Sequence, residues 1–259
     1  MSSETGTSRL SFLGIAAFAT LLIISLLGNV LLAVALWDTF GKLQAARIFP
    51  LGYAPHAQHL APSSRLPHSI AFWGDSRAYH WDTQALSDRW AIFNFAHGGQ
   101  TSSQLLLQMD STLTTHTDVA VVQIGINDLH PLGVLHAQQH EVISRLRENL
   151  GAVRDRLLTR ADLVIMTTIF PPGPVPLARR LAWDPRTREY IADVNESLRL
   201  VAAHDRVVLI DAYVMLGDKS SVLAGEFADP DFFLHINAGG YRRLNAELEK
   251  ILQARRDQP

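Results

Sequence analysis

Short apolar runs recur along the chain after Pro67, with polar segments between them. Each run spans about four to eight residues and is rich in β-branched or aromatic side chains. A strand that is covered on both faces of a parallel sheet is apolar without alternation. The runs therefore predict five buried strands, at residues 69–73, 90–96, 119–125, 161–170 and 206–213.

The segments between these runs carry apolar residues at helical spacing. The clearest covers residues 142–157, and the last covers residues 241–252. Alternation of strand and helix is typical of a parallel sheet with helices on both faces. We therefore predict an α/β fold of three layers (α/β/α), with a parallel five-stranded sheet of the flavodoxin-like type, preceded by one transmembrane helix.

The first part of the chain has a different pattern. Residues 10–37 form a run of 28 residues without a charge, bounded by Arg9 and Asp38. A helix needs about 20 apolar residues to cross the core of a bilayer, so this run can span it with some tilt. We predict a transmembrane anchor at 10–37 after a short tail at 1–9. A signal peptide cleaved near 33–35 is the second interpretation, and a buried core helix is the third.

Composition limits the remaining possibilities. Prolines at positions 50, 55, 62 and 67 predict a tether over residues 38–67, which leaves 68–259 as a single domain. The absence of cysteine excludes a disulfide scaffold, and a formal net charge of -2 argues against nucleic acid as the main partner. We find no zinc-type spacing and no phosphate-binding glycine loop, and we predict no cofactor and no bound metal.

Polar residues follow the predicted strands. Ser76 comes after the first strand, Gly99 after the second and Asn127 after the third, while His235 lies in the loop before the last helix. Because the carboxyl ends of parallel strands meet at one edge of a sheet, these residues converge there. Acyl transfer from an ester needs a hydroxyl nucleophile, an imidazole base and N–H donors for the oxyanion. The alternative for Ser76 is a helix cap.

The four positions stand in blocks that resemble those of the SGNH (GDSL-type) hydrolase family. The blocks are WGDSR, HGGQTS, GINDL and LHINAGGY, in that order. The resemblance covers residues from about 69 to the end of the chain and implies that Ser76 attacks while His235 is its base. It also implies an oxyanion hole made by the backbone N–H groups of Ser76 and Gly99 and the side-chain amide of Asn127.

One position departs from the family pattern. The family usually has an aspartate three residues before the histidine, where this chain has Phe232. Asp231, four residues before, is our first choice for the carboxylate that orients His235, with a bulge of the loop absorbing the extra residue and residues 232–234 packing inward. Asp229 is the second choice, and a backbone carbonyl, as in a dyad, is the third.

Several neighbours of these residues have structural interpretations. Asp75 and Asp128 are expected to hold loops by accepting hydrogen bonds from nearby backbone N–H groups, and Asn237 is expected to cap the last helix. Three residues after the nucleophile could line a pocket or lie on an exposed helical turn, namely Arg77, His80 and Trp81.

The segment 170–174, with Trp183 beyond it, could form a rim of the site. A rigid surface loop is the favoured interpretation of this proline-rich turn.

Together these observations predict a membrane-anchored serine esterase that acts on O-acyl esters, possibly of envelope glycans or lipids. An O-acyltransferase with the same site is one alternative, and a non-catalytic subunit of a membrane complex is another. Charges beside the apolar run lean slightly toward a cytoplasmic domain. The resemblance implies envelope esters, so we predict a single-pass protein with an extracytoplasmic domain on the periplasmic side.

Overall fold

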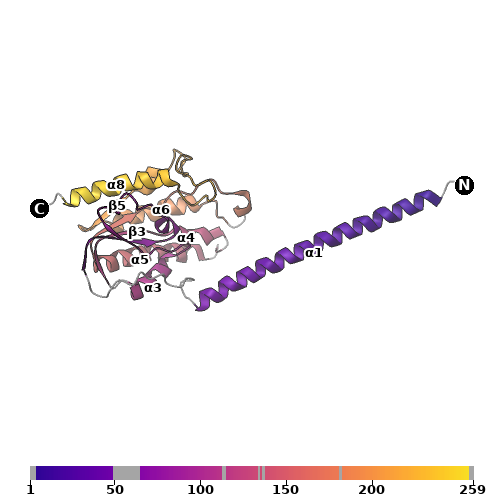
Figure 1. Ribbon diagram of the computed structural model, residues 1–259, viewed down its shortest axis with the longest axis horizontal. Helices are drawn as coiled ribbons and strands as arrows, with labels where there is room; N and C mark the ends of the chain where they lie inside the picture. The colour runs from indigo at the N-terminus through magenta and orange to yellow at the C-terminus, as the bar shows by residue number, and fades with distance from the viewer. Residues whose placement is uncertain are drawn as a thin grey trace. The chain divides into compact units, whose positions relative to one another are not determined.

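The computed structural model describes residues 4–48, 65–112, 115–133, 135, 138–180 and 183–256 (Figure 1). The chain divides into two compact units, residues 1–54 and residues 55–259. The first unit contains the helix α1 (Glu4–Ile48). Its segment Gly14–Leu36 is long and apolar enough to cross a membrane, and the side chains there are exposed. Membrane anchors and signal sequences both show this length and composition.

The helix extends beyond the predicted anchor at 10–37. Residues 42–47 are good helix formers, and residues 38–48 contain no proline, so the helix continues past Gly41 without losing a backbone N–H donor. The part of the predicted tether that remains between α1 and the first strand, residues 49–64, lies outside the described residues. The first strand begins at Arg65, within the C-terminal end of that predicted tether.

The second unit contains the predicted five-stranded sheet, and all its pairings are parallel. The strand order is β2-β1-β3-β4-β5, the doubly wound order of flavodoxin-like folds. The predicted fold class is therefore confirmed. The strands are β1 (Arg65–Gly74), β2 (Ala91–Asn94), β3 (His116–Gln123), β4 (Ala161–Thr167) and β5 (Val207–Ile210).

Helices and short helical turns connect the strands. The longer helices are α3 (Ser102–Thr112), α5 (Gln139–Leu158), α6 (Thr187–Val201) and α8 (Ala238–Arg256). The short elements are α2 (Ser76–Tyr79), α4 (Ile126–Leu129), η1 (His130–Gly133), η3 (Leu177–Arg179) and α7 (Ala212–Leu216).

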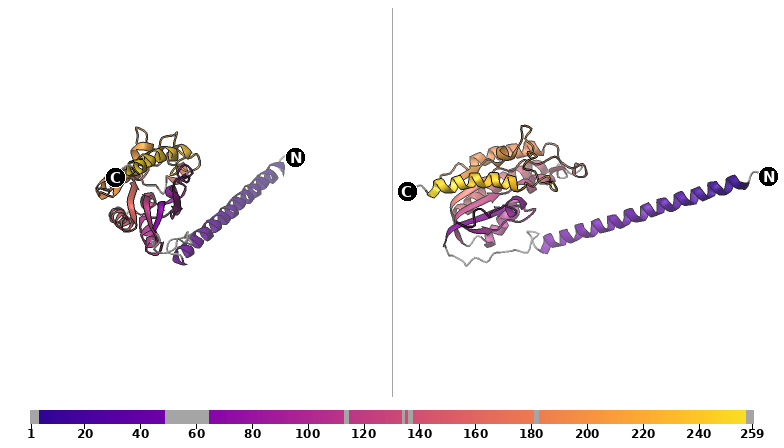
Figure 2. Two further views of the ribbon diagram at one scale, coloured as in Figure 1. Left: turned by 60° about the vertical axis from the view of Figure 1, so that its left-hand side comes forward. Right: turned by 45° about the horizontal axis from the view of Figure 1, so that its top comes forward.

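The sheet divides the hydrophobic core into two layers. Successive side chains of a strand point to opposite faces, and β1 illustrates this alternation. Ile70 and Phe72 pack on the side of α8, whereas Ala71 and Trp73 pack on the side of α3, α5 and α6. Figures 1 and 2 show the sheet between these two helical layers. Strands covered on both faces explain the continuous apolar runs in the sequence.

Candidate active site

Ser76 and His235 lie together at the carboxyl edge of the sheet, although 159 positions separate them in the chain. Ser76 opens α2 directly after β1, and His235 lies in the loop before α8. The Nε2 atom of His235 is 3.0 Å from the Oγ atom of Ser76, within hydrogen-bonding distance. Both residues are partly exposed, so a substrate can reach the pair that the sequence predicted.

The turn before Ser76 depends on a glycine. Gly74 has a φ of 135°, and a Cβ atom at this position would lie 1.7 Å from the carbonyl oxygen of Gln123 on β3. No other residue type fits this backbone. The N–H of Asp75 then donates to the same oxygen at 3.1 Å. The strand end is therefore fastened to β3 at the point where Ser76 emerges.

Asp75 caps the short helix that contains Ser76. Its Oδ1 atom accepts a hydrogen bond from the N–H of Arg77 at 2.9 Å, as expected from the sequence, so the cap is Asp75 and not Ser76. Burial raises the pKa of Asp75 to about 7, against the effect of the Arg77 guanidinium. Because α2 has only four residues, its dipole adds little at Ser76.

Arg77 is buried, with a relative exposure of 1 %. Its Nε atom donates to the carbonyl oxygen of Leu234 at 2.6 Å, and its Nη1 atom donates to that of Phe170 at 3.1 Å. Leu234 directly precedes His235. Arg77 therefore ties the turn of the serine to the loop of the histidine and to the segment that follows β4.

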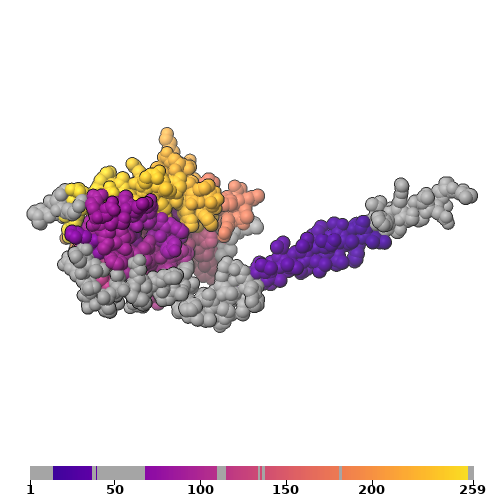
Figure 3. Space-filling model, viewed as in Figure 1, coloured from indigo at the N-terminus to yellow at the C-terminus, as the bar shows by residue number. Residues whose placement is uncertain are grey.

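Of the two interpretations that the sequence left open for Arg77, His80 and Trp81, the exposed turn is wrong for Arg77 and for Trp81, which are both buried. Trp81 is buried against α8, where its Nε1 atom donates to Oδ1 of Asn245 at 2.7 Å. Figure 3 shows this part of the chain directly beside α8. His80 is exposed, and its ring centroid lies 5.6 Å from that of His235.

The predicted oxyanion donors lie at the neighbouring strand ends. Gly99 has a φ of 75°, and a Cβ atom on the preceding Gly98 would lie 3.9 Å from the Cβ of Ser76. The Nδ2 atom of Asn127 donates to the carbonyl oxygen of Gln100 at 3.1 Å, which leaves its second hydrogen available. Within the described part of the chain, the backbone N–H groups of Ser76 and Gly99 donate to no protein acceptor.

Asp128 supports this edge of the sheet. Its carboxylate accepts hydrogen bonds from the N–H of Ser102 at 3.0 Å and from the Oγ of Ser102 at 2.6 Å. Burial raises the pKa of Asp128 to about 6, and the bonds from Ser102 oppose that rise. The loop-holding role expected for Asp128 is confirmed, because these bonds attach the start of α3 to α4.

Several hydrogen bonds within the loop that carries His235 hold its backbone in place. The Oδ1 atom of Asp229 accepts hydrogen bonds from the N–H groups of Asp231 and Phe232, at 2.8 and 3.1 Å. The N–H of His235 donates to the carbonyl of Phe232 at 2.9 Å. Phe232 is 59 % exposed, so the expected inward packing of residues 232–234 is wrong for this side chain.

The charges around His235 distinguish the two candidate aspartates. Burial lowers the pKa of His235, as do the nearby Arg77 and His80, while Asp229 raises it. Asp231 is exposed, and within residues 183–256 no hydrogen bond joins the carboxylate of either aspartate to His235. The assignment of Asp231 as the orienting residue stays a prediction, and the effect of the Asp229 charge on the pKa of His235 favours Asp229.

The sequence profile of the GDSL-like lipase/acylhydrolase family matches residues 67–243, which include the sheet except for the first two residues of β1, and also the Ser76–His235 pair. This chain belongs to that family. The recognition from the four sequence blocks is confirmed, and the chain is a serine hydrolase of the GDSL (SGNH) type that acts on ester bonds. No curated protein matches the chain.

Solved structures share the fold of this GDSL-like protein. A putative platelet activating factor from Streptococcus pneumonia is 21% identical, with a TM-score of 0.64 and coverage of 85% of this chain and 98% of that one. A putative acylhydrolase from Bacteroides fragilis is 18% identical (TM-score 0.61, 77% and 94% covered). An acetylxylan esterase from Geobacillus stearothermophilus is 17% identical (TM-score 0.56, 71% and 94% covered).

In this GDSL-like domain, Asn237 caps α8. Its Oδ1 atom accepts hydrogen bonds from the N–H groups of Gly239 and Gly240, at 2.8 and 3.1 Å. The cap predicted from the sequence is confirmed, and it places the start of α8 three residues after His235. Among the side chains that the structure describes, no group of three acidic or histidine residues could hold a metal ion.

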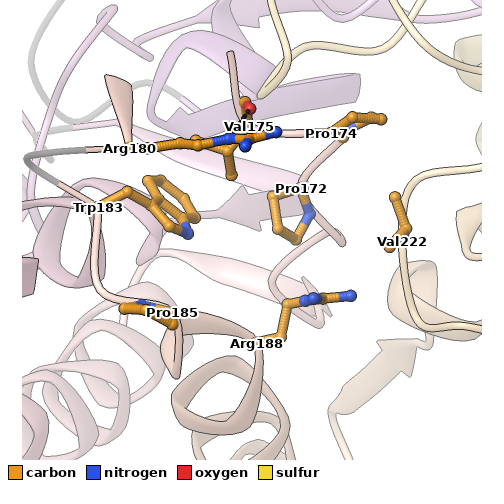
Figure 4. A pocket seen from close by; sticks show the side chains of 9 residues that line it. Pro172, Pro174, Val175, Arg180, Trp183, Pro185, Arg188 and Val222 are labelled. Atoms are coloured by element: carbon orange, nitrogen blue, oxygen red, sulfur yellow. Dashed lines mark hydrogen bonds between the residues drawn. The ribbon is translucent and has the colours of Figure 1, made fainter. Parts of the chain in front are cut away.

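A cavity of about 330 Å³ lies beside the segment 170–174 (Figure 4). Proline, valine and tryptophan side chains form most of its wall, and Arg180 and Arg188 also border it. The N–H of Gly173 donates to the carbonyl of Phe233 at 2.6 Å, so the wall joins the histidine loop. Sequence analysis favoured a plain surface loop here, because a proline-rich turn gives no signal of a cavity.

Proposed function

We propose that this GDSL-like protein is a membrane-anchored serine esterase with Ser76 as the nucleophile and His235 as the general base. The single observation that carries the proposal is the 3.0 Å approach of His235 Nε2 to Ser76 Oγ at the edge of the sheet. An imidazole at that distance can remove the hydroxyl proton as the oxygen attacks.

In the first step, the Oγ of Ser76 bonds to the carbonyl carbon of the ester while His235 Nε2 takes the hydroxyl proton. The carbonyl oxygen becomes an oxyanion. The tetrahedral intermediate then collapses, the bond to the alcohol oxygen breaks, and that oxygen takes the proton from His235. The products of this step are the free alcohol and an acyl group on Ser76.

In the second step, His235 takes a proton from water, and the water oxygen attacks the acyl carbon. The proton returns to Ser76 as the carboxylic acid leaves, which restores the enzyme.

The backbone N–H groups of Ser76 and Gly99 and the amide of Asn127 are proposed to stabilise the oxyanion. The proposal is supported by the lack of a protein acceptor for the two N–H groups in the described part of the chain. It is also supported by the bond from Asn127 to Gln100, which orients the amide and leaves one hydrogen for substrate. Removing one such donor typically costs a factor of about 10²–10³ in kcat.

The proposed substrates are O-acyl esters of envelope glycans or lipids. The segment Gly14–Leu36, which meets the length and composition of a membrane span, supports an anchored enzyme. We propose a single-pass anchor at residues 10–37 with the domain on the extracytoplasmic side. The protein should then stay with membranes after washing with carbonate and become soluble when residues 1–40 are deleted. Recovery of a shorter mature chain that lacks the apolar segment, in the soluble fraction, would instead identify a signal peptide.

The test of the chemistry is labelling with a fluorophosphonate, together with hydrolysis of a short-chain aryl ester. The wild-type protein should react with the fluorophosphonate and hydrolyse the aryl ester. Ser76→Ala should do neither, while its thermal unfolding midpoint stays unchanged. Asn127→Ala should lower kcat by about 10²–10³ with little change in KM. A wild-type protein that neither labels nor turns over would favour a non-catalytic subunit, and transfer of the acyl group to an added sugar faster than to water would favour an acyltransferase.

A further inference from the structure

The cavity beside the segment 170–174 combines an apolar wall with positive charge. Pro172, Trp183, Pro185 and Val222 form part of the wall. In Figure 4, Arg180 and Arg188 border the same space from opposite sides. The lining includes no acidic side chain. A ligand that fits this site has an apolar body and a negative charge.

The two arginines differ from their neighbours in their partners. Arg186 pairs with Asp184, and Arg199 pairs with Glu196. In contrast, within the described part of the chain neither Arg180 nor Arg188 has an acidic partner. Among the described residues, the guanidinium group of Arg180 makes one hydrogen bond, a long one of 3.4 Å from Nε to the carbonyl of Val175. Both guanidinium groups therefore have donors available for a carboxylate or a phosphate.

The wall of the cavity is continuous with the catalytic loops. Besides the bond from Gly173 to Phe233, the ring of Trp183 packs edge-on against the ring of Phe233 with centroids 5.2 Å apart. Phe233 lies two residues before His235. At the other end of the segment, the carbonyl of Phe170 accepts the bond from Arg77, next to Ser76. A group bound in the cavity therefore lies against a wall segment that itself contacts both loops of the proposed catalytic pair.

We propose that this cavity is a substrate subsite that binds the non-reacting part of an ester with an apolar body and an anionic group. The inference rests on the proposed esterase function and adds to it a preference for anionic esters. Arg180 and Arg188 hold the anion, and Trp183 and the prolines cover the apolar body.

The kinetic test uses matched pairs of esters with the full-length protein in a non-ionic detergent. One pair is 4-acetoxybenzoate and its neutral methyl ester, with the charge on the alcohol side. The other is 4-nitrophenyl hydrogen adipate and its methyl ester, with the charge on the acyl side. The double substitution Arg180→Gln/Arg188→Gln should raise KM for one of the anionic esters about three- to tenfold, with the neutral partner within about twofold. The affected pair identifies the side that the cavity holds.

A matched control removes the same charge elsewhere. Arg89→Gln/Arg145→Gln changes two exposed arginines whose partners are Glu249 and Glu141, and it should leave both pairs unchanged. Val222→Trp, which fills the cavity, should raise KM for both members of the affected pair. Equal effects of the two double substitutions on the anionic esters would overturn the proposal, because they would indicate only a long-range effect of net charge.

A binding measurement separates the subsite from the chemistry. Calorimetric titration measures the Kd of 4-phenylbutyrate, which Arg180→Gln/Arg188→Gln should raise about three- to tenfold. The Kd of the neutral 4-phenylbutyramide should not change with this double substitution. If the esterase proposal fails, this binding difference remains. If 4-phenylbutyrate binds the wild-type and double-substituted proteins equally, the subsite is wrong even where ester hydrolysis is normal.

Discussion

Ser76 and His235 are held in place by different parts of the structure. The serine follows a central strand, and its turn is buried, fastened to β3 through Gln123 and capped by Asp75. The histidine lies in a loop whose hydrogen bonds are mostly to its own residues, such as those that Asp229 accepts. The position of Ser76 is therefore fixed by the sheet, whereas that of His235 depends on contacts within its loop and on Arg77.

This difference indicates which half of the site sets the geometry. Gly74 lies so close to the backbone of β3 that no other residue fits there. This contact fixes the conformation of the turn that carries Ser76. The histidine loop includes a phenylalanine that is more than half exposed and an aspartate with no hydrogen bond to the histidine within residues 183–256. We therefore expect changes on the histidine side to alter rate and pH dependence, and changes at the link between the sides to alter stability as well.

The largest effect is expected at Arg77, which connects the turn of Ser76 to the loop of His235. Arg77→Ala removes the donor of the buried carbonyl of Phe170 and of the partly buried carbonyl of Leu234, and a buried unpaired group costs about 1–3 kcal/mol. Displacement of His235 by about 1 Å is enough to lower kcat by about 10². Arg77→Lys should restore part of the rate, because an ammonium reaches one carbonyl but lacks the planar fork. Chemical denaturation and the labelling rate of Ser76 measure the two effects.

The pH profile tests whether Arg77 acts on His235 or only on folding. The positive charge of Arg77 lowers the pKa of His235. Its removal should therefore raise that pKa and move the acidic limb of kcat/KM to higher pH. A variant that loses stability but keeps the wild-type acidic limb would make Arg77 a purely structural residue.

The parts of the fold that follow from the sheet were predictable from sequence. Continuous apolar runs mark strands covered on both faces, and Ser76 and Asn127 were predictable because they follow strand ends, whereas His235 was predictable from the sequence block before the last helix. Asp75 was predictable as a cap because its side chain bonds a backbone N–H two residues away. In each case the contact is local or is dictated by the regular geometry of parallel strands.

The rest depends on contacts between distant loops. An arginine after the nucleophile is usually exposed, and its burial becomes clear only when the carbonyls of Phe170 and Leu234 converge on it. The cavity beside Trp183 arises in the same way. Helix α1 continues to Ile48 because propensity carries it beyond the apolar run, whose pattern alone ends at Trp37.

A smaller effect is expected from the two aspartates of the histidine loop. The prediction from sequence is a large loss of kcat for Asp231→Asn, as for a wrong tautomer, and little loss for Asp229→Asn. The charge effect of Asp229 on the pKa of His235 favours the opposite order. Asparagine at 229 keeps an oxygen for the two backbone N–H groups but loses the charge that raises the pKa of His235. We expect Asp229→Asn to lower kcat about tenfold and Asp231→Asn to have less than about a twofold effect.

Steady-state kinetics on both variants, with His235→Ala as the inactive reference, resolve the order. A loss confined to Asp231→Asn would restore the first choice made from sequence. Near-normal kcat in both variants would mean that a dyad of Ser76 and His235 operates without a carboxylate.

The smallest effect is expected at His80, on the solvent side of the histidine loop. When protonated, its ring adds a positive charge 5.6 Å from the ring of His235, and this charge lowers the pKa of His235. The base must be neutral to accept the proton of Ser76, so the acidic limb of kcat/KM lies below the range of an ordinary histidine. His80→Gln removes the charge, which raises the pKa of His235 and moves the limb to higher pH.

Because His80 is exposed, the shift should be small and should shrink as salt is added. His116→Gln, which changes a histidine paired with Asp162, should leave the profile in place. A shift to lower pH, or one that salt does not reduce, would show that the ring of His80 acts by packing rather than by charge.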